Sequence, residues 1–400
     1  MLKVLAIFPL CLFRQELRDK GVQLIAIIPS GKSVHPDDVE FDFYGNPSGL
    51  PDFVRKLFDK HQPDIIFQDD DSSPLLHAGL EDLPVPKIWY AIDSHLHNWH
   101  KHFSAIFDFV FYAQKNRAVE FEHFQKNSAW LPLCMTISGT KWVPWSDRHR
   151  DSVFVGTLDE KINPARVALL KKVQELGVSV EIIRQHYLEI YPYAKIVINQ
   201  SARNDLNFRF FEAGGCGALL ITDEIGQSDA GILTPGEDFL LYKGAEDLAE
   251  KIKWVLAHPE IAEAMGRRAF DKIQSGHLAS HRAQTILEKL TQMVGSKTTR
   301  TDFQKAQLAF SLQLSSFINY PQNLLDFFQA KSDRLLQEEY SDPLSLEWNK
   351  LSQGLGYILR KDTTTAWNHL QSMDMFGDDE WLNQYLRHFK VATAQAFRST

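Results

Sequence analysis

The chain has 400 residues, of which 44% are hydrophobic and 24% are charged, and its formal net charge is −8. This composition is typical of a soluble globular protein with two or three domains, and the negative charge argues against nucleic acid as the main partner. Three widely spaced cysteines, Cys11, Cys134 and Cys216, indicate no disulfide framework. We therefore expect a protein of the reducing cytoplasm.

The first thirteen residues are apolar except for Lys3, and they continue directly into a charged segment without a small-residue cleavage site. We interpret residues 4–8 as a buried strand followed by a helix, and not as a signal peptide. Nothing elsewhere approaches the length of a membrane-spanning helix, so no transmembrane segment is expected.

Residues 1–140 alternate between apolar strands and helices, which is typical of a parallel sheet covered on both faces. The predicted strands are residues 4–8, 22–28, 64–67, 87–92 and 107–113. No glycine follows the first strand, so a dinucleotide fingerprint is absent there. This segment is predicted to form one doubly wound, Rossmann-like domain.

Three aspartates, Asp69, Asp70 and Asp71, follow the predicted strand at 64–67. Such a group could bind a metal ion or a sugar. We favour a solvated turn whose carboxylates cap the helix that follows.

Residues 135–150 show little periodicity and are predicted to link two domains. A second alternating series fills residues 148–295, with strands expected at 152–156, 178–183, 196–199, 218–221 and 239–242. From residue 300 to residue 400 the pattern is helical, and Pro321 and Pro343 divide it. This extension is either a repeat-like appendage or a helical cap, and it could bind a protein partner. The predicted fold class is thus α/β, with two doubly wound domains and a helical C-terminal extension.

Residues 204–223 read as a polar loop, a short helix, a glycine-rich turn and an apolar strand. Arg209 and Glu212 share one face of the helix, at i and i+3. A helix start with one cation and one carboxylate suits a ligand that carries phosphate and hydroxyl groups. We expect Gly156 to let backbone approach phosphate, Arg209 to neutralise it and Glu212 to accept ribose hydroxyls. The alternative is a surface helix pair and a packing glycine.

The segment from residue 93 to residue 102 contains four histidines after a predicted strand. Either Asp93 or His95 could deprotonate an acceptor hydroxyl, or Asp93 could orient His95 to do so. A metal site is disfavoured, because alternate histidines point in different directions. The other reading is a polar helix start that Asp93 caps.

The run Asn-Phe-Arg-Phe-Phe-Glu-Ala-Gly-Gly-Cys-Gly that begins at Asn207 resembles the donor-binding segment of GT-B glycosyltransferases. More narrowly, it is similar to the CgeB-like, spore-maturation-type branch. Further similar segments are residues 90–96, 154–156, 199, 235–238 and 277–282. The resemblance covers roughly residues 1–295.

The resemblance implies metal-independent transfer of a sugar from a nucleoside-diphosphate donor, of UDP type, to an unidentified acceptor. The second domain would hold the donor and the first domain the acceptor. Glu212 matches the ribose-binding glutamate, and Arg209 is the expected diphosphate partner. Three further residues complete the predicted donor site: Arg166, Asn199 and Asn207. Related branches often carry another glutamate where this chain has Asn204, which leaves the stereochemistry open.

Two alternatives remain at this point. A non-catalytic glycan- or partner-binding protein could keep the fold and use its helical tail for interaction. Asn204 supports that reading, whereas Arg209 and Glu212 argue against it. A nucleotide-sugar epimerase on the same fold is the other alternative.

Overall fold

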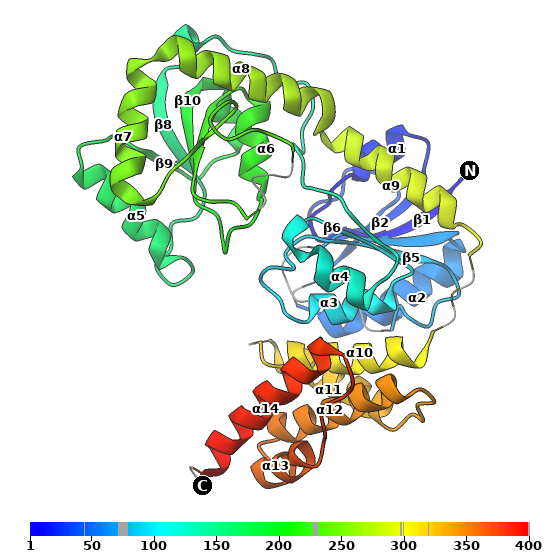
Figure 1. The fold of residues 1–400 in the computed structure, drawn as a ribbon. Helices are drawn as coiled ribbons and strands as arrows, with labels where there is room; N and C mark the ends of the chain where they lie inside the picture. The colour runs from blue at the N-terminus through cyan, green and yellow to red at the C-terminus, as the bar shows by residue number, and fades with distance from the viewer. Residues whose placement is uncertain are drawn as a thin grey trace.

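The structure is a computed structural model that describes residues 1–43, 45–70, 79–226, 231–296, 298, 300–318 and 320–398. Two parallel sheets, of seven and five strands, form the centres of two α/β domains, and a helical extension follows them. Figure 1 shows the three parts, with the extension on the far side of the first domain from the second domain. The expected fold class is confirmed.

The first sheet has the strand order β3-β2-β1-β4-β5-β6-β7, and all its pairs are parallel. Its strands are β1 (Lys3–Ile7), β2 (Gln23–Pro29), β3 (Asp38–Phe41), β4 (Ile65–Gln68), β5 (Lys87–Ala91), β6 (Phe109–Tyr112) and β7 (Ser128–Trp130). The order reverses between β1 and β4, so a crevice is expected outside their carboxyl ends. The central strands are buried on both faces, which explains their uninterrupted apolar runs.

The second sheet has the order β12-β11-β10-β8-β9, again with parallel pairs only. Its strands are β8 (Arg150–Val155), β9 (Glu181–Ile183), β10 (Ala194–Asn199), β11 (Leu219–Thr222) and β12 (Leu240–Leu241). Here the order reverses between β8 and β10. The loops after these two strands therefore border the second crevice.

Helices cover both sheets. Those of the first domain are α1 (Arg14–Asp19), α2 (Leu50–His61), α3 (His100–Phe103) and α4 (Ala118–Phe124). Those that follow are α5 (Pro164–Glu175), α6 (Phe208–Gly215), α7 (Gly244–Ala257), α8 (Pro259–Gly276) and α9 (Ala279–Met293). None of the helices in the described ranges combines the length and apolar character that crossing a bilayer requires.

The chain crosses between the domains twice, and the two crossings lie side by side. Met135 and Leu278 form a parallel β-bridge, in which the Met135 N–H donates to the His277 carbonyl at 2.9 Å. Buried Arg282 donates to the carbonyl oxygen of Pro132, on the other crossing, at 2.8 Å. The two connections thus form one joined hinge.

Helix α9 packs on α1 and the first sheet, as Figure 1 shows, although the sequence placed it within the second domain at 148–295. Lys20 donates to Gln284 at 2.9 Å, and the Lys289 ammonium lies 4.3 Å from the centre of the Phe109 ring. The periodicity of α9 predicts a helix correctly. It carries no information about which sheet that helix covers.

The extension contains α10 (Asp302–Ser315), α11 (Gln322–Leu336), α12 (Pro343–Leu359), α13 (Thr363–Gln371) and α14 (Glu380–Arg398). It shares a core with the first domain, in which Trp99 and Phe103 join the same cluster as Leu308 and Leu312. The His102 ring bridges to the extension through Gln307 Oε1, at 2.6 Å, and the Tyr385 hydroxyl, at 3.1 Å. The extension is therefore part of the packing of the first domain.

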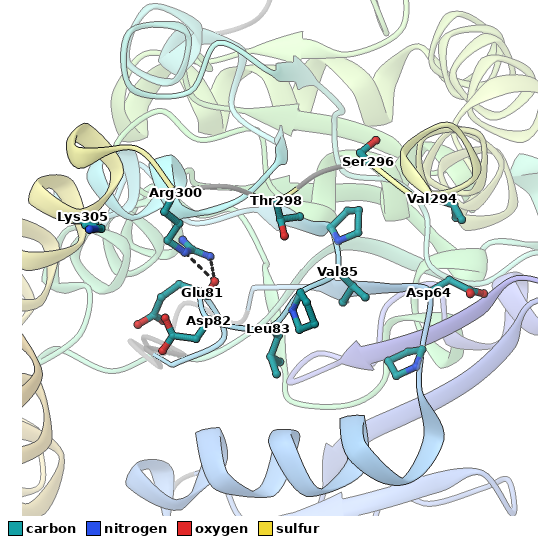
Figure 2. Close-up of a pocket in the computed structure, with 14 residues that line it drawn as sticks. Asp64, Glu81, Asp82, Leu83, Val85, Val294, Ser296, Thr298, Arg300 and Lys305 are labelled. Carbon is teal, nitrogen blue, oxygen red and sulfur yellow. Dashed lines mark hydrogen bonds between the residues drawn. The ribbon is translucent and has the colours of Figure 1, made fainter.

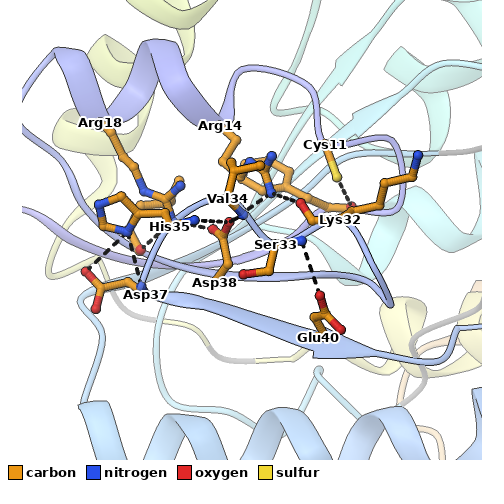
Figure 3. Close-up of polar contacts among 12 residues, drawn as sticks. Cys11, Arg14, Arg18, Lys32, Ser33, Val34, His35, Asp37, Asp38 and Glu40 are labelled. Atoms are coloured by element: carbon orange, nitrogen blue, oxygen red, sulfur yellow. Dashed lines mark hydrogen bonds and ion pairs between the residues drawn. The ribbon is translucent and has the colours of Figure 1, made fainter.

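Asp38, at the start of edge strand β3, joins the loop before it to helix α1 (Figure 3). Its carboxylate accepts hydrogen bonds from Arg14 at 3.0 Å, from Arg18 at 2.6 Å and from the Val34 N–H at 2.9 Å. Burial alone would raise the pKa of Asp38, but these donors and the two positive charges lower it. The contacts fix the edge of the first sheet.

Candidate functional site

A cavity of about 550 Å³ lies at the carboxyl edge of the second sheet, beside the loops that follow β8 and β10. It is lined by Thr136, Val155, Arg166, Gln185, His186, Tyr187, Tyr191, Ala202, Asp205, Asn207, Phe208, Arg209 and Glu212. This is the crevice that the reversal in strand order predicts. Four of the six donor-site residues expected from the sequence, Arg166, Asn207, Arg209 and Glu212, lie in this lining.

Arg209, in the first turn of α6, is fixed by contacts within the second domain. Its Nε donates to the Val155 carbonyl at 3.2 Å, and its Nη1 donates to Asn199 Oδ1. The guanidinium carbon lies 4.9 Å from the centre of the Phe154 ring. A cation held in this way meets an anionic ligand with little loss of side-chain freedom.

Gly156 and Asn199, the other two predicted donor residues, lie outside the described lining and support Arg209. Gly156 has a φ of +155°, and a Cβ there would lie 3.1 Å from Arg209 Nη2. Asn199 is fully buried and donates to Thr222 Oγ1 at 2.9 Å while its own Oδ1 receives Arg209. The glycine therefore makes room for the Arg209 side chain.

Glu212 lies one turn after Arg209, where it is half-buried in the wall of the same cavity. Within the described part of the chain, its carboxylate forms no hydrogen bond and no ion pair. Burial raises the pKa of Glu212 to about 7, although the positive charge of Arg209 opposes this shift. A carboxyl group that is partly shielded from water and has no hydrogen-bond donor destabilises the folded protein, and a ligand that donates to it would remove this cost.

Arg166 places a second cation beside the first. Asn163 caps α5 through the Arg166 N–H, and the guanidinium donates to Gln200 Oε1 and to the Gln200 carbonyl, each at 3.1 Å. The Arg166 guanidinium carbon lies 5.3 Å from the same Phe154 ring that contacts Arg209. Burial, and then the charge of Arg209, lower the pKa of Arg166. The cavity wall therefore holds two guanidinium groups against the same aromatic ring.

Asn207 is the N-cap residue of α6, but its side chain does not cap the helix. Its Nδ2 donates instead to Asn199 Oδ1 at 3.2 Å, and its Oδ1 is buried without a partner among the described residues. The Phe210 N–H in the first turn of α6 already donates to the Asn207 carbonyl at 3.2 Å. The N–H groups of Phe208 and Arg209 have no acceptor among the described residues, so they are left to an incoming acceptor, and the helix dipole favours an anionic one.

Sequence reasoning missed several lining residues, above all Asp205. This residue is buried, its Oδ1 accepts the Ala202 N–H at 2.5 Å, and burial raises its pKa. Asn204, where a second glutamate was looked for, is exposed and has a φ of +63°. The carboxylate that this loop contributes to the cavity lining is therefore that of Asp205, the residue after Asn204.

Gln185, His186 and Tyr187 were also missed, and they lie just after β9. The His186 and Tyr187 rings are stacked, with 4.9 Å between their centres. The rule that ligands bind at the carboxyl ends of parallel strands could have identified this loop.

Asp93 and His95 follow β5 of the first domain, and neither lies in the described lining of the cavity. His95 is 5% exposed, and its Nδ1 has no partner in the described ranges. Burial lowers the pKa of His95 to about 4, and the charges of Arg117 and Arg203 add to this effect. Arg203 of the second domain donates to the His95 carbonyl at 3.3 Å. The His95 loop therefore contacts the loop that leads into α6.

The other histidines of this segment point elsewhere. His100 is fully buried beside Trp89 and Trp99, with its Nδ1 3.6 Å from Asp70 Oδ2. His102 faces the extension. The described residues contain no group of three or more His, Cys, Asp or Glu side chains arranged to hold a metal ion.

The preference for a solvated turn at residues 69–71 was wrong for the two aspartates that the structure describes; Asp71 lies outside the described residues. Asp69 is fully buried and accepts the N–H groups of Leu10, at 3.3 Å, and Leu12, at 3.0 Å. Asp70 accepts the Ile92 N–H at 3.1 Å. These two carboxylates are buried because they hold the loops after β1 and β5.

A cavity of about 870 Å³ lies at the opposite edge of the first domain, beside the residues that precede β4 and β5 (Figure 2). Arg300 is directed at Glu81 there and donates to its backbone carbonyl at 2.7 Å. Both the arginine and the nearby Lys331–Glu81 ion pair join the extension to the first domain. We therefore place the functional site in the smaller cavity, where the Glu212 carboxylate and Asn207 Oδ1 have no hydrogen-bond partner among the described residues.

Residues 135–288 match a protein family described as glycosyl transferase-like. No curated protein matches the sequence. The family match spans the cavity, α6 and both crossings between the domains.

Three solved structures are similar in fold. Sucrose-phosphate synthase from Thermosynechococcus elongatus is 15% identical with a TM-score of 0.55, over 73% of this chain and 99% of that one. A glycosyltransferase from Rickettsia africae is 13% identical with a TM-score of 0.53, over 74% and 99%. HepE from Anabaena, in complex with UDP and glucose, is 11% identical with a TM-score of 0.52, over 73% and 100%. The chain therefore has the GT-B fold, and its residues 135–288 match the glycosyl transferase-like family.

Proposed function

We propose that the protein is a glycosyltransferase that binds a nucleoside-diphosphate sugar in the cavity at α6 and transfers the sugar to an acceptor held by the first domain. The observation that carries the proposal is the Glu212 carboxyl group, which lines the cavity without a hydrogen-bond donor among the described residues. The vicinal hydroxyls of a ribose supply two donors to one carboxylate.

The diphosphate would lie near the start of α6. Arg209 and Arg166 supply positive charge there, and the N–H groups of Phe208 and Arg209 in the first turn supply further donors. In the transition state the leaving diphosphate gains negative charge, and these fixed groups would stabilise it without reorganisation. The proposed reaction uses no metal ion, so activity should survive chelation.

The acceptor base is proposed separately. His95 is neutral at physiological pH because burial lowers its pKa to about 4, so its ring can accept a proton. That low basicity calls for a partner carboxylate, and Asp93 lies two residues away. Asp93→Asn and His95→Ala should each abolish transfer and leave donor binding intact. Full activity in both variants would remove this assignment.

A non-catalytic binding protein is the second candidate. The observation in its favour is that Asp93 and His95 lie outside the described lining of the donor cavity. Closure about the Met135–Leu278 hinge would have to bring the first-domain loops over the donor before transfer. Nucleotide binding without any turnover of a bound nucleotide sugar would favour this candidate.

Titration calorimetry with UDP, ADP, GDP and UDP-glucose tests the proposal. We expect at least one nucleotide to bind and Glu212→Ala to weaken binding about tenfold, as the loss of charge-assisted hydrogen bonds should. Glu250→Ala, at an exposed position on α7, is the matched control and should bind as the wild type does. If none of the four ligands binds the wild type, the enzyme proposal fails.

The finer assignments belong to the same proposal. They are a hexosyltransferase of the CgeB-like branch, a donor of UDP type, a cytoplasmic location and a protein partner for the helical extension. Similarity to HepE, whose structure contains UDP, supports UDP as the first nucleotide to test.

A further inference from the structure

Two contacts join the domains directly beside the cavity, and both use the loop that leads from β10 into α6. The Gln114 side chain, from the first domain, donates through Nε2 to the Leu206 carbonyl at 3.4 Å and accepts the Leu206 N–H on Oε1 at 3.0 Å. Arg203 of the same loop donates to the His95 carbonyl at 3.3 Å. We call these two contacts the interdomain clasp.

The Gln114–Leu206 pair is a specific contact. A single primary amide takes up both backbone polar groups of one residue, as a neighbouring strand would. Gln114 and Leu206 are each 1% exposed, so water has little access to these groups. Loss of the amide would leave a buried N–H and a buried carbonyl without partners.

The loop that the clasp holds has a strained backbone. Arg203 and Asn204 have φ values of +56° and +63°, a region that residues other than glycine rarely adopt. Such conformations persist only where the surroundings fix them. The Ala202 N–H bonded to Asp205 and the Gly226 N–H bonded to the Asn204 carbonyl fix this loop from within the second domain. The clasp fixes it from the first domain.

Leu206 lies between two residues of the cavity lining, Asp205 and Asn207, and Asn207 is the N-cap residue of α6. A shift at Leu206 would therefore move both neighbours and the first turn of the helix. Gln114 lies outside the described lining, and its contacts with Leu206 connect it to these two lining residues.

We propose that Gln114 is a positioning residue, which fixes the start of α6 from the opposite domain and so couples the donor cavity to the placement of the first domain. The consequence for catalysis rests on the proposed function. The coupling itself is a property of the protein without ligand.

The chain offers a matched control in Gln125, which is also buried, at 7% exposure. Its Nε2 donates to the Ser104 carbonyl at 3.0 Å, and its Oε1 accepts the Asn127 N–H at 3.0 Å. Gln125→Ala removes similar hydrogen bonds within the first domain alone. A role in stability would affect both variants, whereas a positioning role would affect only Gln114→Ala.

The first measurement is hydrogen exchange at the Leu206 amide in the full chain without nucleotide. We expect exchange about tenfold faster in Gln114→Ala and unchanged in Gln125→Ala. An amide that has lost its buried acceptor needs a local opening of lower free energy before it can exchange with water. If Gln114→Ala fails to fold, Gln114→Leu serves instead, because its side chain fills similar space but can neither accept the Leu206 N–H nor donate to the Leu206 carbonyl. Exchange equal to that of the wild type in the folded variant would overturn the proposal.

The second measurement is the affinity for UDP. We expect Gln114→Ala to lower it about threefold to tenfold and Gln125→Ala to leave it unchanged, even where both variants lose similar thermal stability. Equal UDP affinities in all three proteins would overturn the positioning role. A wild type that binds no UDP would count against the proposed donor, while the exchange experiment would still decide whether the clasp exists.

Discussion

The carboxyl edges of the two sheets differ in how their carboxylates are paired. In the first domain, Asp69 and Asp70 are saturated by backbone N–H groups of neighbouring loops. In the second domain, the Glu212 carboxylate and the buried Asn207 Oδ1 have no partners among the described residues. The same topology thus yields buried carboxylates that the protein itself pairs at one edge and a carboxylate that a ligand would pair at the other.

This contrast predicts that removing a carboxylate changes the free energy of unfolding in opposite directions at the two edges. Groups that are satisfied within the protein stabilise the native state, whereas a group kept for a ligand destabilises the free protein. Three substitutions test the contrast, beginning with the one that has the largest expected effect.

Glu212→Gln should stabilise the free protein. The pKa of Glu212 rises from 4.5 to about 7 on folding, so the folded state loses stability as pH increases through this range. At about 1.4 kcal/mol per pH unit the loss reaches about 3 kcal/mol above pH 7, and the glutamine variant avoids it. Urea unfolding of both proteins should show a gain for the variant at pH 8 that is absent at pH 4. A variant that is less stable at pH 8 would contradict the idea that the edge is kept for a ligand.

Asp69→Ala should destabilise the protein by about 2 kcal/mol, because the N–H groups of Leu10 and Leu12 lose their acceptor. Urea unfolding at pH 7 gives the difference. The control is Asp59→Ala, at an exposed position on α2, which should change stability by less than about 0.5 kcal/mol. If Asp69→Ala leaves the free energy of unfolding unchanged, the Asp69 carboxylate is not stabilised by the N–H groups of Leu10 and Leu12 as described.

Asp38→Asn extends the test to the outer strand of the first sheet, where the expected loss is about 1 kcal/mol at pH 7. The pKa of Asp38 is lowered in the folded state, so its contribution is present above pH 3.8 and disappears as pH falls through the lowered pKa. The difference between variant and wild type should therefore vanish in acid. Asp37→Asn, an exposed neighbour, should show no difference at either pH.

The sequence predicted those parts of the fold and the site that depend on local pattern. Apolar runs and glycines located most of the strands, and the i, i+3 spacing brought Arg209 and Glu212 to one cavity. The support of Arg209 by Gly156 and Asn199 depends on β8 and β10 being neighbours, which only the strand order establishes. Spacing along the chain therefore could not separate the residues that line the cavity from those behind it.

Contacts between distant segments account for what the sequence did not predict. Asp69 was read as solvated because its partners lie in the loop after β1, almost sixty residues earlier in the chain. Gln114 had no signal at all, since its partner is the backbone of a residue in the other domain. Partners of this kind leave no periodicity in either segment.

The return of α9 to the first sheet means that the first domain is discontinuous in the sequence. Residues that follow the whole second domain cover part of its surface and contribute Ile286 and Leu290 to its core. A fragment that ends near residue 140 would expose this apolar surface, and a fragment that starts near residue 148 would carry an unpaired amphipathic helix. Either domain can be isolated intact only by cutting the chain at both crossings. An internal deletion that joins the first crossing directly to α9 would remove the second domain and keep the first domain whole.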